Sequence, residues 1–372
     1  MLINKKRKIN KMNNIAKILS IVSCVLFAQD DFFESGYSIG GYGELHYNQS
    51  KAVDEDPTKK LDFHRFIIYY GYNWTEEWSF KSELELEHNY VSGSNGELEL
   101  EQAYINYHKE NWGFQGGVIL PTVGLINEYH EPPLFLSVER PDYNKYIIPT
   151  TWFGNGIAIY SNWNDLKLRL ALLEDLEGEG ILDDGHIRGG RGKGYKTTGY
   201  SLVKNMSAVY TGINGLRVGG SLTLNDAPID NNPDTSISVR MFEVNAKYSA
   251  NNIYAIFEFG QNSFSGNNTS TDYYDDHHNK IGTLVSSSGY YLDVGYDMGS
   301  IINCNKLIPW FRVSNVSTDV DTDSKITDYM RLGLTWWPID NIAFKFDYGS
   351  MTKKSDKDNP VTQINLGLGY NF

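Results

Sequence analysis

Cysteine, proline and long apolar runs are scarce in this chain. Its 372 residues include only 2 cysteines, Cys24 and Cys304, and 11 prolines. So few cysteines exclude a disulfide framework as the source of stability. After residue 30, no stretch approaches the roughly 18 consecutive apolar residues that a membrane-spanning helix requires. A role in a membrane would therefore have to use strands.

Positive charge is also in deficit, with 33 Lys and Arg against 46 Asp and Glu and a formal net charge of −13. This acidic balance excludes nucleic acid as an expected partner. Six of the positive charges precede residue 18, and an apolar run from Ile18 to Ala28 follows them. This order predicts a secretory signal peptide over residues 1–28, and its removal moves the formal charge to −19. A lipoprotein cleavage box ending at Cys24 is the alternative.

Glycine and aromatic residues are abundant, with 35 Gly, 26 Tyr, 17 Phe and 8 Trp. At the carboxyl end, alternate residues from Ile364 to Phe372 are apolar, and those between them are Asn or Gly. Because side chains alternate across a strand, this segment has one apolar and one small polar face. A soluble β-sandwich has the same pattern. A strand that closes the chain on an aromatic residue, however, resembles the last strand of outer-membrane barrels.

Similar alternation recurs along the whole chain. We predict an all-β fold, a transmembrane antiparallel β-barrel of about sixteen strands, with residues 29–372 as one domain. An even strand number places both chain ends on the same side of the membrane. The expected strands are residues 36–48, 61–74, 78–90, 97–108, 112–120, 153–162, 166–175, 199–211, 216–225, 237–249, 252–262, 287–299, 306–315, 328–337, 341–350 and 361–372.

The lengths of the connections support this prediction independently. Every second connection is short, which is typical of periplasmic turns, and the others are mostly longer and rich in Asp, Asn, Gly and Ser, as extracellular loops are. The connections expected to be long are residues 49–60, 91–96, 121–152, 176–198, 226–236, 263–286, 316–327 and 351–360.

The alternation also assigns faces. Leu168 and Leu170 are expected to face lipid, which turns Lys167 and Arg169 inward, and the same argument places Arg331 and Lys345 inside. A Lys or Arg on the lipid side would cost about 2–4 kcal/mol at mid-bilayer. In the second strand, Phe63 and Phe66 differ in parity, which predicts a β-bulge between them.

Charged residues on the inward parity predict a wetted channel, because unpaired charges could not remain in a dry core. Carboxylates would line one wall near the outer mouth, and basic side chains from later strands would line another; the alternative is that lumens simply need polar side chains. The acidic set is Glu83, Glu85, Glu87, Glu97, Glu99 and Glu101, and the basic set is Lys167, Arg169, Arg217, Lys247, Arg312, Arg331 and Lys345.

The 121–152 connection is too apolar for a solvated loop. A loop of this length without regular structure is usually functional or disordered, and its composition argues against disorder. We expect it to fold into the lumen and narrow the pore; the alternative is a lid over the outer rim. The residues expected to control passage are Glu128, Glu131, Glu139, Arg140, Asp142 and Lys145.

Residues 185–194, GHIRGGRGKG, form the one strongly basic connection. Arg188, Arg191 and Lys193 are candidates for binding phosphate or another anion. The alternative is a solvated, flexible loop. No metal site, cofactor or catalytic residue is expected.

Several segments resemble outer-membrane porins of the phosphate-selective porin (porin O and P) family. They are GGYGELHYN (40–48), DFHRFIIYYGYNW (62–74), FKSELELEHN (80–89), LEQAYINY (100–107), NEYHEPPLFLSVERPDYNKYIIPTTW (127–152) and IRGGRGKG (187–194). The resemblance implies a sixteen-stranded diffusion or anion-preferring porin that assembles as a homotrimer and whose third outer loop enters the channel. Phosphate selectivity in that family relies on Arg and Lys ladders, whereas this chain is acidic. Arg140, Lys145, Lys167, Arg169, Arg188 and Arg191 are the matching basic residues.

These observations predict a passive outer-membrane channel for small hydrophilic solutes or ions, and not an enzyme. The expected partners are outer-membrane lipid and lipopolysaccharide, the barrel-assembly machinery through the strand that ends at Phe372, and further copies of the chain. The alternatives are a barrel enzyme of the protease or phospholipase type and a plugged structural barrel.

Overall fold

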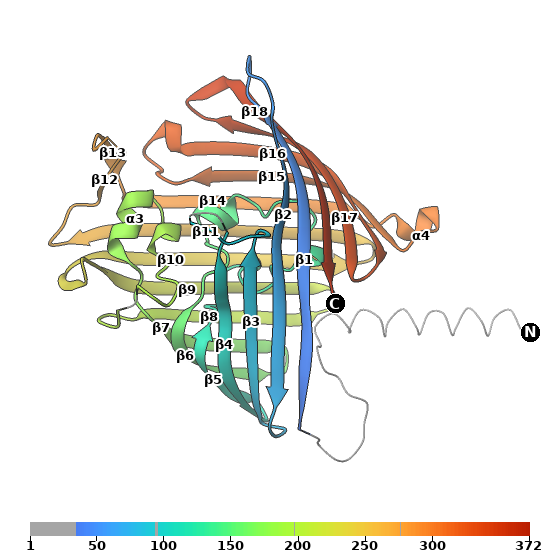
Figure 1. Cartoon of the computed structure of the whole chain (residues 1–372), viewed down its shortest axis with the longest axis horizontal. Helices are drawn as coiled ribbons and strands as arrows, with labels where there is room; N and C mark the ends of the chain where they lie inside the picture. The colour runs from blue at the N-terminus through green and yellow to red at the C-terminus, as the bar shows by residue number, and fades with distance from the viewer. Residues whose placement is uncertain (1–34, 94–95, 197, 276) are drawn as a thin grey trace, which may run out of the picture.

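Alternating apolar and polar residues form sixteen antiparallel strands that close into a barrel in the computed structural model (Figure 1). The structure describes residues 35–93, 96–196, 198–275 and 277–372, so the expected signal peptide lies outside the described residues. The barrel strands are β1 (Gly36–Lys51), β2 (Thr58–Asn73), β3 (Trp78–Glu87), β4 (Leu98–Lys109), β5 (Trp112–Ile119), β6 (Gly154–Trp163), β7 (Leu166–Leu173), β8 (Val203–Ile213), β9 (Leu216–Ile229), β10 (Asn232–Ala250), β11 (Ile253–Asn267), β14 (Ser286–Tyr296), β15 (Lys306–Ser317), β16 (Ile326–Ile339), β17 (Ile342–Lys353) and β18 (Asp356–Asn371).

The first and last strands close the barrel. β1 pairs with β18 in an antiparallel register, and Gly41 and Phe372 exchange backbone hydrogen bonds of 3.0 and 2.9 Å. Closure gives the backbone groups of both strands partners on either side, which a barrel in lipid requires because no water is there to bind them. The predicted all-β, sixteen-stranded architecture is confirmed.

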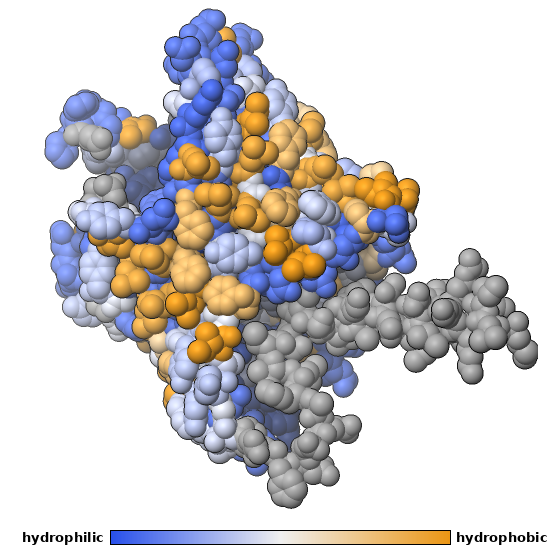
Figure 2. Space-filling model, turned by 45° about the vertical axis from the view of Figure 1, so that its right-hand side comes forward, coloured by the Kyte–Doolittle hydropathy of each residue, from blue (hydrophilic) through white to orange (hydrophobic). Residues whose placement is uncertain are grey.

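The faces of the strands follow the predicted parity. On β7, Leu170 is 51% exposed on the outer surface, whereas Arg169 is 7% exposed on the inner side. On β16, Met330 and Leu332 are exposed and Arg331 is buried. Figure 2 shows the result, a broad band of apolar side chains over one outer face with hydrophilic residues at its margins. Such a broad apolar band suits contact with lipid.

Aromatic side chains gather at one edge of this band. The ring of Trp78 at the start of β3 lies 4.8 Å from that of Tyr107, and the Tyr107 ring lies 5.2 Å from that of Trp112 at the start of β5, both measured between centroids. All three lie at the end of the barrel that carries the short turns. Amphipathic rings at this level are typical of the girdles at a membrane interface.

The predicted bulge in β2 is present and lies at His64. Arg65 pairs with Glu44, whereas Phe63 pairs with the next residue of β1, Leu45. His64 is therefore the extra residue, with no partner of its own on β1. The bulge explains why the two phenylalanines that flank it share a face despite their different parity.

Two connections that were expected to be long are tight turns, which corrects the prediction for 226–236 and 351–360. β9 and β10 continue until only Asp230 and Asn231 join them, and β17 and β18 are joined by residues 354–355. Asp230 and Asn231 have φ values of 53° and 55°, the left-handed pair that a two-residue type I′ hairpin turn needs. The polar residues that suggested loops lie instead on strands that extend beyond the apolar band.

The remaining connections carry short elements. Helix α3 and the hairpin of β12 and β13 lie at one end of the barrel, and α4 lies at the other (Figure 1). Among the described residues, no helix is long and apolar enough to cross a membrane. The short elements are η1 (Pro132–Leu134), α2 (Tyr143–Tyr146), α3 (Gly178–Asp184), η2 (Ile187–Gly190), β12 (Asp272–Tyr274), β13 (Lys280–Thr283), α4 (Gly299–Ile302) and η3 (Asp323–Lys325).

The connection between β5 and β6 contains η1 and α2 and lies against the inner side of the wall. Val123, Val138 and Ile147 are fully buried although they belong to no strand. Backbone groups of this connection bond to inward-facing side chains of β8, β11, β16 and β17, and Arg312 of β15 donates to the Ser137 hydroxyl. We call residues 121–152 the lumen segment.

Candidate functional site

Small inward-facing residues on the wall make room for the lumen segment. A Cβ atom at Gly260 of β11 would lie 2.6 Å from the hydroxyl of Tyr143 and 2.9 Å from Ile148. A Cβ atom at Gly369 of β18 would lie 2.4 Å from Pro132. Any larger side chain at these positions would push the segment away from the wall. The alternation of glycine with large apolar residues therefore serves two contacts, lipid outside and the segment inside.

The wall formed by β14 to β17 binds the segment mainly through its backbone. Asp347 accepts a hydrogen bond from Val138 N at 2.8 Å, and Lys345 Nζ donates to Ser137 O at 2.8 Å. Thr335 Oγ1 donates to the neighbouring carbonyl, Leu136 O, at 2.6 Å. Consecutive backbone groups of the lumen segment thus form hydrogen bonds with side chains, which permits their burial.

The two arginines of this wall are paired with aspartates. Arg312 Nε and Nη2 lie 2.5 and 2.6 Å from the two carboxylate oxygens of Asp293, and Arg331 Nη1 lies 2.5 Å from Asp347. These four side chains are at most 8% exposed because the segment covers them. The expected open basic wall is therefore largely a set of buried ion pairs on this side of the barrel.

The wall formed by β1 to β4 is rich in carboxylates. Glu83, Glu85 and Glu101 are buried, with 4% exposure or less. Arg65 lies among them, with its Nε atom 2.7 Å from Glu44 and its Nη1 atom 3.2 Å from Glu85. One guanidinium is outnumbered by the carboxylates around it, so this wall keeps a negative balance that must be met by other groups.

His130 of the lumen segment supplies one of those groups. Its Nε2 atom lies 3.1 Å from Glu83 and 3.5 Å from Glu101, and its Nδ1 atom lies 3.2 Å from Asn127 O. Burial alone would lower the pKa of His130, but the Glu83 carboxylate and the bonds to both glutamates outweigh burial and hold the pKa well above its ordinary value. A positive imidazolium therefore fastens the segment to β3 and β4.

Glu139 makes a second ionic contact, with β1. Its Oε1 atom lies 2.9 Å from Nδ1 of His46, whose Nε2 atom lies 3.0 Å from Glu44. Burial would raise the pKa of Glu139, but the bond to His46 and the charge of that ring prevail and lower the pKa to about 2. Carboxylates on both ring nitrogens suit a doubly protonated His46.

The other charged residues predicted in the segment have separate positions. Glu128 accepts from Thr122 Oγ1 at 2.7 Å and lies 3.6 Å from Arg217 of β9. Glu131 accepts from the Tyr69 hydroxyl at 3.4 Å. The contacts of the last three are local: Arg140 Nη2 donates to His130 O at 3.4 Å, Asp142 O accepts from the backbone N of Lys145 at 3.0 Å, and the Lys145 ammonium lies 5.0 Å from the Tyr146 ring centre.

A small polar hollow of about 30 Å³ separates the start of the segment from the wall of β7 to β9. Glu128, Lys167 and Arg217 contribute to its lining. Arg169 lies nearby and donates to Gln115 Oε1 at 3.1 Å. The hollow has room for about one water molecule. The basic residues predicted on this wall therefore face the segment and not a wide aqueous space.

The basic connection around residues 185–194 is folded, and two of its three anion candidates have partners. Arg191 donates from Nη1 to the carbonyl oxygens of Thr150 and Thr151, at 2.7 and 3.0 Å. Lys193 contacts the carboxylates of Glu97 and Glu99. Arg188 lies in η2 and is half-buried. The connection thus attaches the end of the lumen segment to the acidic wall.

Solved structures of known proteins share this arrangement of strands. OmpF of Salmonella typhi, solved with daunomycin, superposes with a TM-score of 0.63 at 13% identity over 90% of this chain and 97% of its own. This is a porin fold. The outer membrane channel DcaP of Acinetobacter baumannii matches with a TM-score of 0.57 at 11% identity, over 91% and 97% of the two chains. A loop-deletion mutant of OmpT from Vibrio cholerae gives 0.57 at 10% identity, over 91% and 99%.

Similarity in sequence does not assign this chain to a family. No family model matches the chain. An uncharacterized protein of Aquifex aeolicus is 44% identical over 149 residues, which is 39% of this chain and 34% of that protein. The chain therefore matches about a third of the length of that relative.

Several inward-facing groups of the porin fold were not predicted from the sequence, among them Glu44, His46, Arg65 and His130. Their signal was present for β1, where Glu44 and His46 share a parity opposite to Leu45. For Arg65 the signal was hidden by the bulge, which changes the parity of the rest of β2. His130 had no periodic signal because it belongs to an irregular segment. In the described chain, no Ser or Thr hydroxyl is hydrogen-bonded to the rings of these histidines.

Proposed function

We propose that this chain is an outer-membrane channel for passive diffusion of small hydrophilic solutes and ions, narrowed by the lumen segment. The observation that carries the proposal is the combination of a closed strand ladder, an apolar exterior and a polar interior crossed by residues 121–152. An apolar exterior is stable in a bilayer, and a closed barrel leaves the interior as the route for polar solutes. Export to the outer membrane and removal of residues 1–28 belong to the same proposal.

The carboxylates of β1 to β4 support a preference for cations over anions. Four carboxylates of this wall face three cationic side chains, which leaves a negative surplus: Arg65 contacts Glu44 and Glu85, His46 contacts Glu44, and His130 contacts Glu83 and Glu101. The arginines of β15 and β16, in contrast, are neutralised by adjacent aspartates. A negative wall raises the local concentration of cations. Phosphate selectivity has less support, because Arg191 and Lys193 are already bonded to carbonyl and carboxylate oxygens.

Assembly as a homotrimer is part of the proposal as well. One of the structurally similar proteins, OmpT of Vibrio cholerae, is described in a trimer form and matches with a TM-score of 0.56 at 11% identity. Cross-linking in detergent or native mass spectrometry measures the number of chains directly.

Planar-bilayer recording of the purified protein tests the channel. We expect stepwise, ohmic conductance and a reversal potential of cation-selective sign in a salt gradient. A variant in which residues 124–150 are replaced by a short Gly-Ser link should show a severalfold larger conductance, because the lumen segment no longer narrows the barrel. The matched control shortens the connection with β12 and β13, which lies at the barrel end and should leave conductance unchanged.

A second variant covers the case in which the deletion does not fold. Lys145→Cys, made with Cys304→Ser, places a thiol on an exposed residue of the lumen segment. A bulky thiol reagent should then reduce the current. Enzymatic activity without conductance would replace the channel by a barrel enzyme, and an inert protein would indicate a plugged structural barrel.

A further inference from the structure

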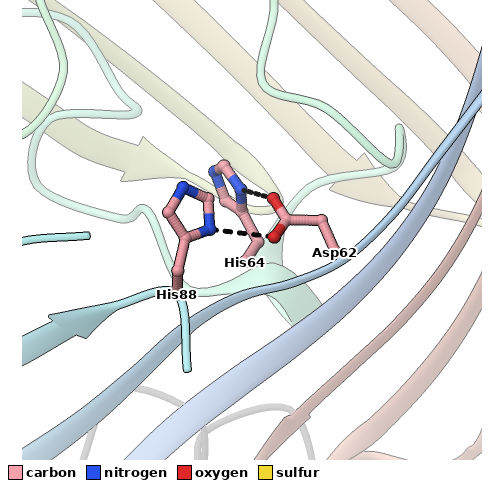
Figure 3. Close-up of side chains that lie close together, drawn as sticks. All are labelled: Asp62, His64 and His88. Atoms are coloured by element: carbon pink, nitrogen blue, oxygen red, sulfur yellow. Dashed lines mark hydrogen bonds and ion pairs between the residues drawn. The ribbon is translucent and has the colours of Figure 1, made fainter. Parts of the chain in front are cut away.

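Two histidines and an aspartate converge on the inner side of the barrel. Nδ1 of His64 lies 3.1 Å from Asp62 Oδ2, and Nδ1 of His88 lies 2.8 Å from Asp62 Oδ1. Figure 3 shows both rings directed at the one carboxylate, His64 and Asp62 from β2 and His88 from the chain after β3. The three potential ligand atoms lie within 4.8 Å of one another.

The bulge of β2 makes this convergence possible. Asp62 and His64 share a parity with outward-facing Ile68, so strict alternation along β2 would place both in the apolar exterior. The bulge shifts the register between Phe63 and Arg65, so Asp62 lies opposite inward-facing His46, and both Asp62 and His64 lie on the inner side. Bulges often redirect a side chain next to a functional site.

Backbone geometry holds the third member in place. His88 follows β3 with a φ of 61°, a left-handed conformation that is uncommon for histidine. Its backbone N donates to His64 O at 3.0 Å. The two rings are therefore connected through the backbone as well as through Asp62, and the set is preorganised.

The three side chains can be reached from water. Their exposed fractions are 12% for Asp62, 23% for His64 and 32% for His88. Lys60 Nζ also lies 2.9 Å from Asp62 Oδ2, but its side chain is 63% exposed and can move away at little cost. A cation that enters would displace this ammonium and the protons on the two Nδ1 atoms.

We propose that Asp62, His64 and His88 form a binding site for a divalent first-row transition-metal ion of the Zn²⁺ class. Two imidazole nitrogens and one carboxylate oxygen suit Zn²⁺ and its neighbours, whereas Ca²⁺ and Mg²⁺ prefer oxygen ligands alone. Three protein ligands leave a fourth position for water or a passing solute. The ring of His46 stacks on that of His64 with 5.0 Å between centroids, which places the site one residue away from Glu139 of the lumen segment.

Metal binding by the purified full-length protein in detergent tests the site. Competition with a chromophoric chelator should reveal one tight Zn²⁺ ion per chain, and Co²⁺ should give visible absorption bands. His88→Asn should weaken Zn²⁺ binding by roughly tenfold or more. Asparagine tolerates the left-handed conformation, so the backbone is retained. Asp62→Asn keeps the shape of the carboxylate and should have a similar effect.

The matched control is His278→Asn. His278 also has a positive φ, 59°, and lies in an Asp- and His-containing turn. The His278→Asn variant should bind Zn²⁺ as the unmodified protein does. The proposal is overturned if the unmodified protein binds no metal, if His88→Asn and Asp62→Asn both bind unchanged, or if only His278→Asn loses the ion.

The consequence for transport rests on the proposed channel and is measured separately. Zn²⁺ should reduce the current through the unmodified protein and not through His88→Asn. Metal binding by a protein that conducts no current would overturn the channel and leave the site intact. Conductance without metal binding would overturn the metal site and leave the channel intact.

Discussion

The two walls that hold the lumen segment do so by different chemistry. The wall of β14 to β17 has its arginines paired with aspartates, and it binds the segment through hydrogen bonds to backbone groups such as Val138 N and Ser137 O. The wall of β1 to β4 carries surplus carboxylates and binds the segment through the ionised side chains of His130 and Glu139. The first attachment is independent of the protonation state of the segment's side chains. The second requires a positive His130 and a negative Glu139.

This difference indicates a division of roles. A wall whose charges are neutralised can support the segment without attracting ions from the lumen. A wall with uncompensated carboxylates can attract cations and also release the segment when its counter-charges are removed. We therefore expect substitutions in the wall of β14 to β17 to lower the free energy of unfolding. Substitutions in the wall of β1 to β4 should mainly alter the mobility of the lumen segment.

The largest expected effect is on the first wall. Arg312→Leu leaves the Asp293 carboxylate buried without its partner and removes a bond to Ser137. We expect the free energy of unfolding in detergent to fall by about 3–5 kcal/mol. The double variant Arg312→Leu with Asp293→Leu should be much less destabilised, because no unpaired charge remains. Urea-dependent unfolding measures both, and equal losses would contradict the ion-pair account.

An intermediate effect is expected at the second wall. His130→Gln retains a hydrogen-bond donor but removes the positive charge between Glu83 and Glu101. We expect a loss of about 1–3 kcal/mol from attachment of the segment, seen as noisier current through single channels. The barrel itself should unfold at nearly the same urea concentration. A large drop in that concentration would show that the two walls are not distinct.

The smallest expected effect is the pH dependence of segment attachment near neutral pH, which follows from the shifted pKa values of His130 and Glu139. Stabilisation by His130, whose pKa is raised, is fully present below its ordinary value of 6.5 and is lost as the pH rises through the elevated value. Stabilisation by Glu139, whose pKa is lowered, is present above 4.5 and is lost as the pH falls from there to about 2. Current noise should therefore be lowest between these limits. In His130→Gln the alkaline increase should be absent.

The strands were predictable because a barrel repeats one local rule. Leu170 and Arg169 are adjacent in sequence, yet Leu170 faces the apolar exterior and Arg169 faces the lumen segment. The alternation of apolar and polar residues reflects these two environments. Strand ends were less predictable. Asp230 and Asn231 have the composition of a loop tip, and the sequence cannot distinguish a tight turn on long strands from a longer loop between short ones.

The candidate site was predictable only in part. The carboxylates Glu83, Glu85 and Glu101 could be assigned to the inner face from their spacing. Their partner His130 could not, because its position depends on how an irregular segment folds across the barrel. His64 was also missed, since a bulge moves it to the inner face against its apparent parity.

The sequence by itself determined the strand number, the two faces of each strand and the apolar character of residues 121–152, because these depend on local alternation and composition. Only the tertiary structure decided which inward charges meet. Arg312 with Asp293, His130 with Glu83, and His88 with Asp62 are brought together by register, by a bulge and by the path of a long connection. Those pairings join residues on different strands and connections, and alternation within one strand carries no information about them.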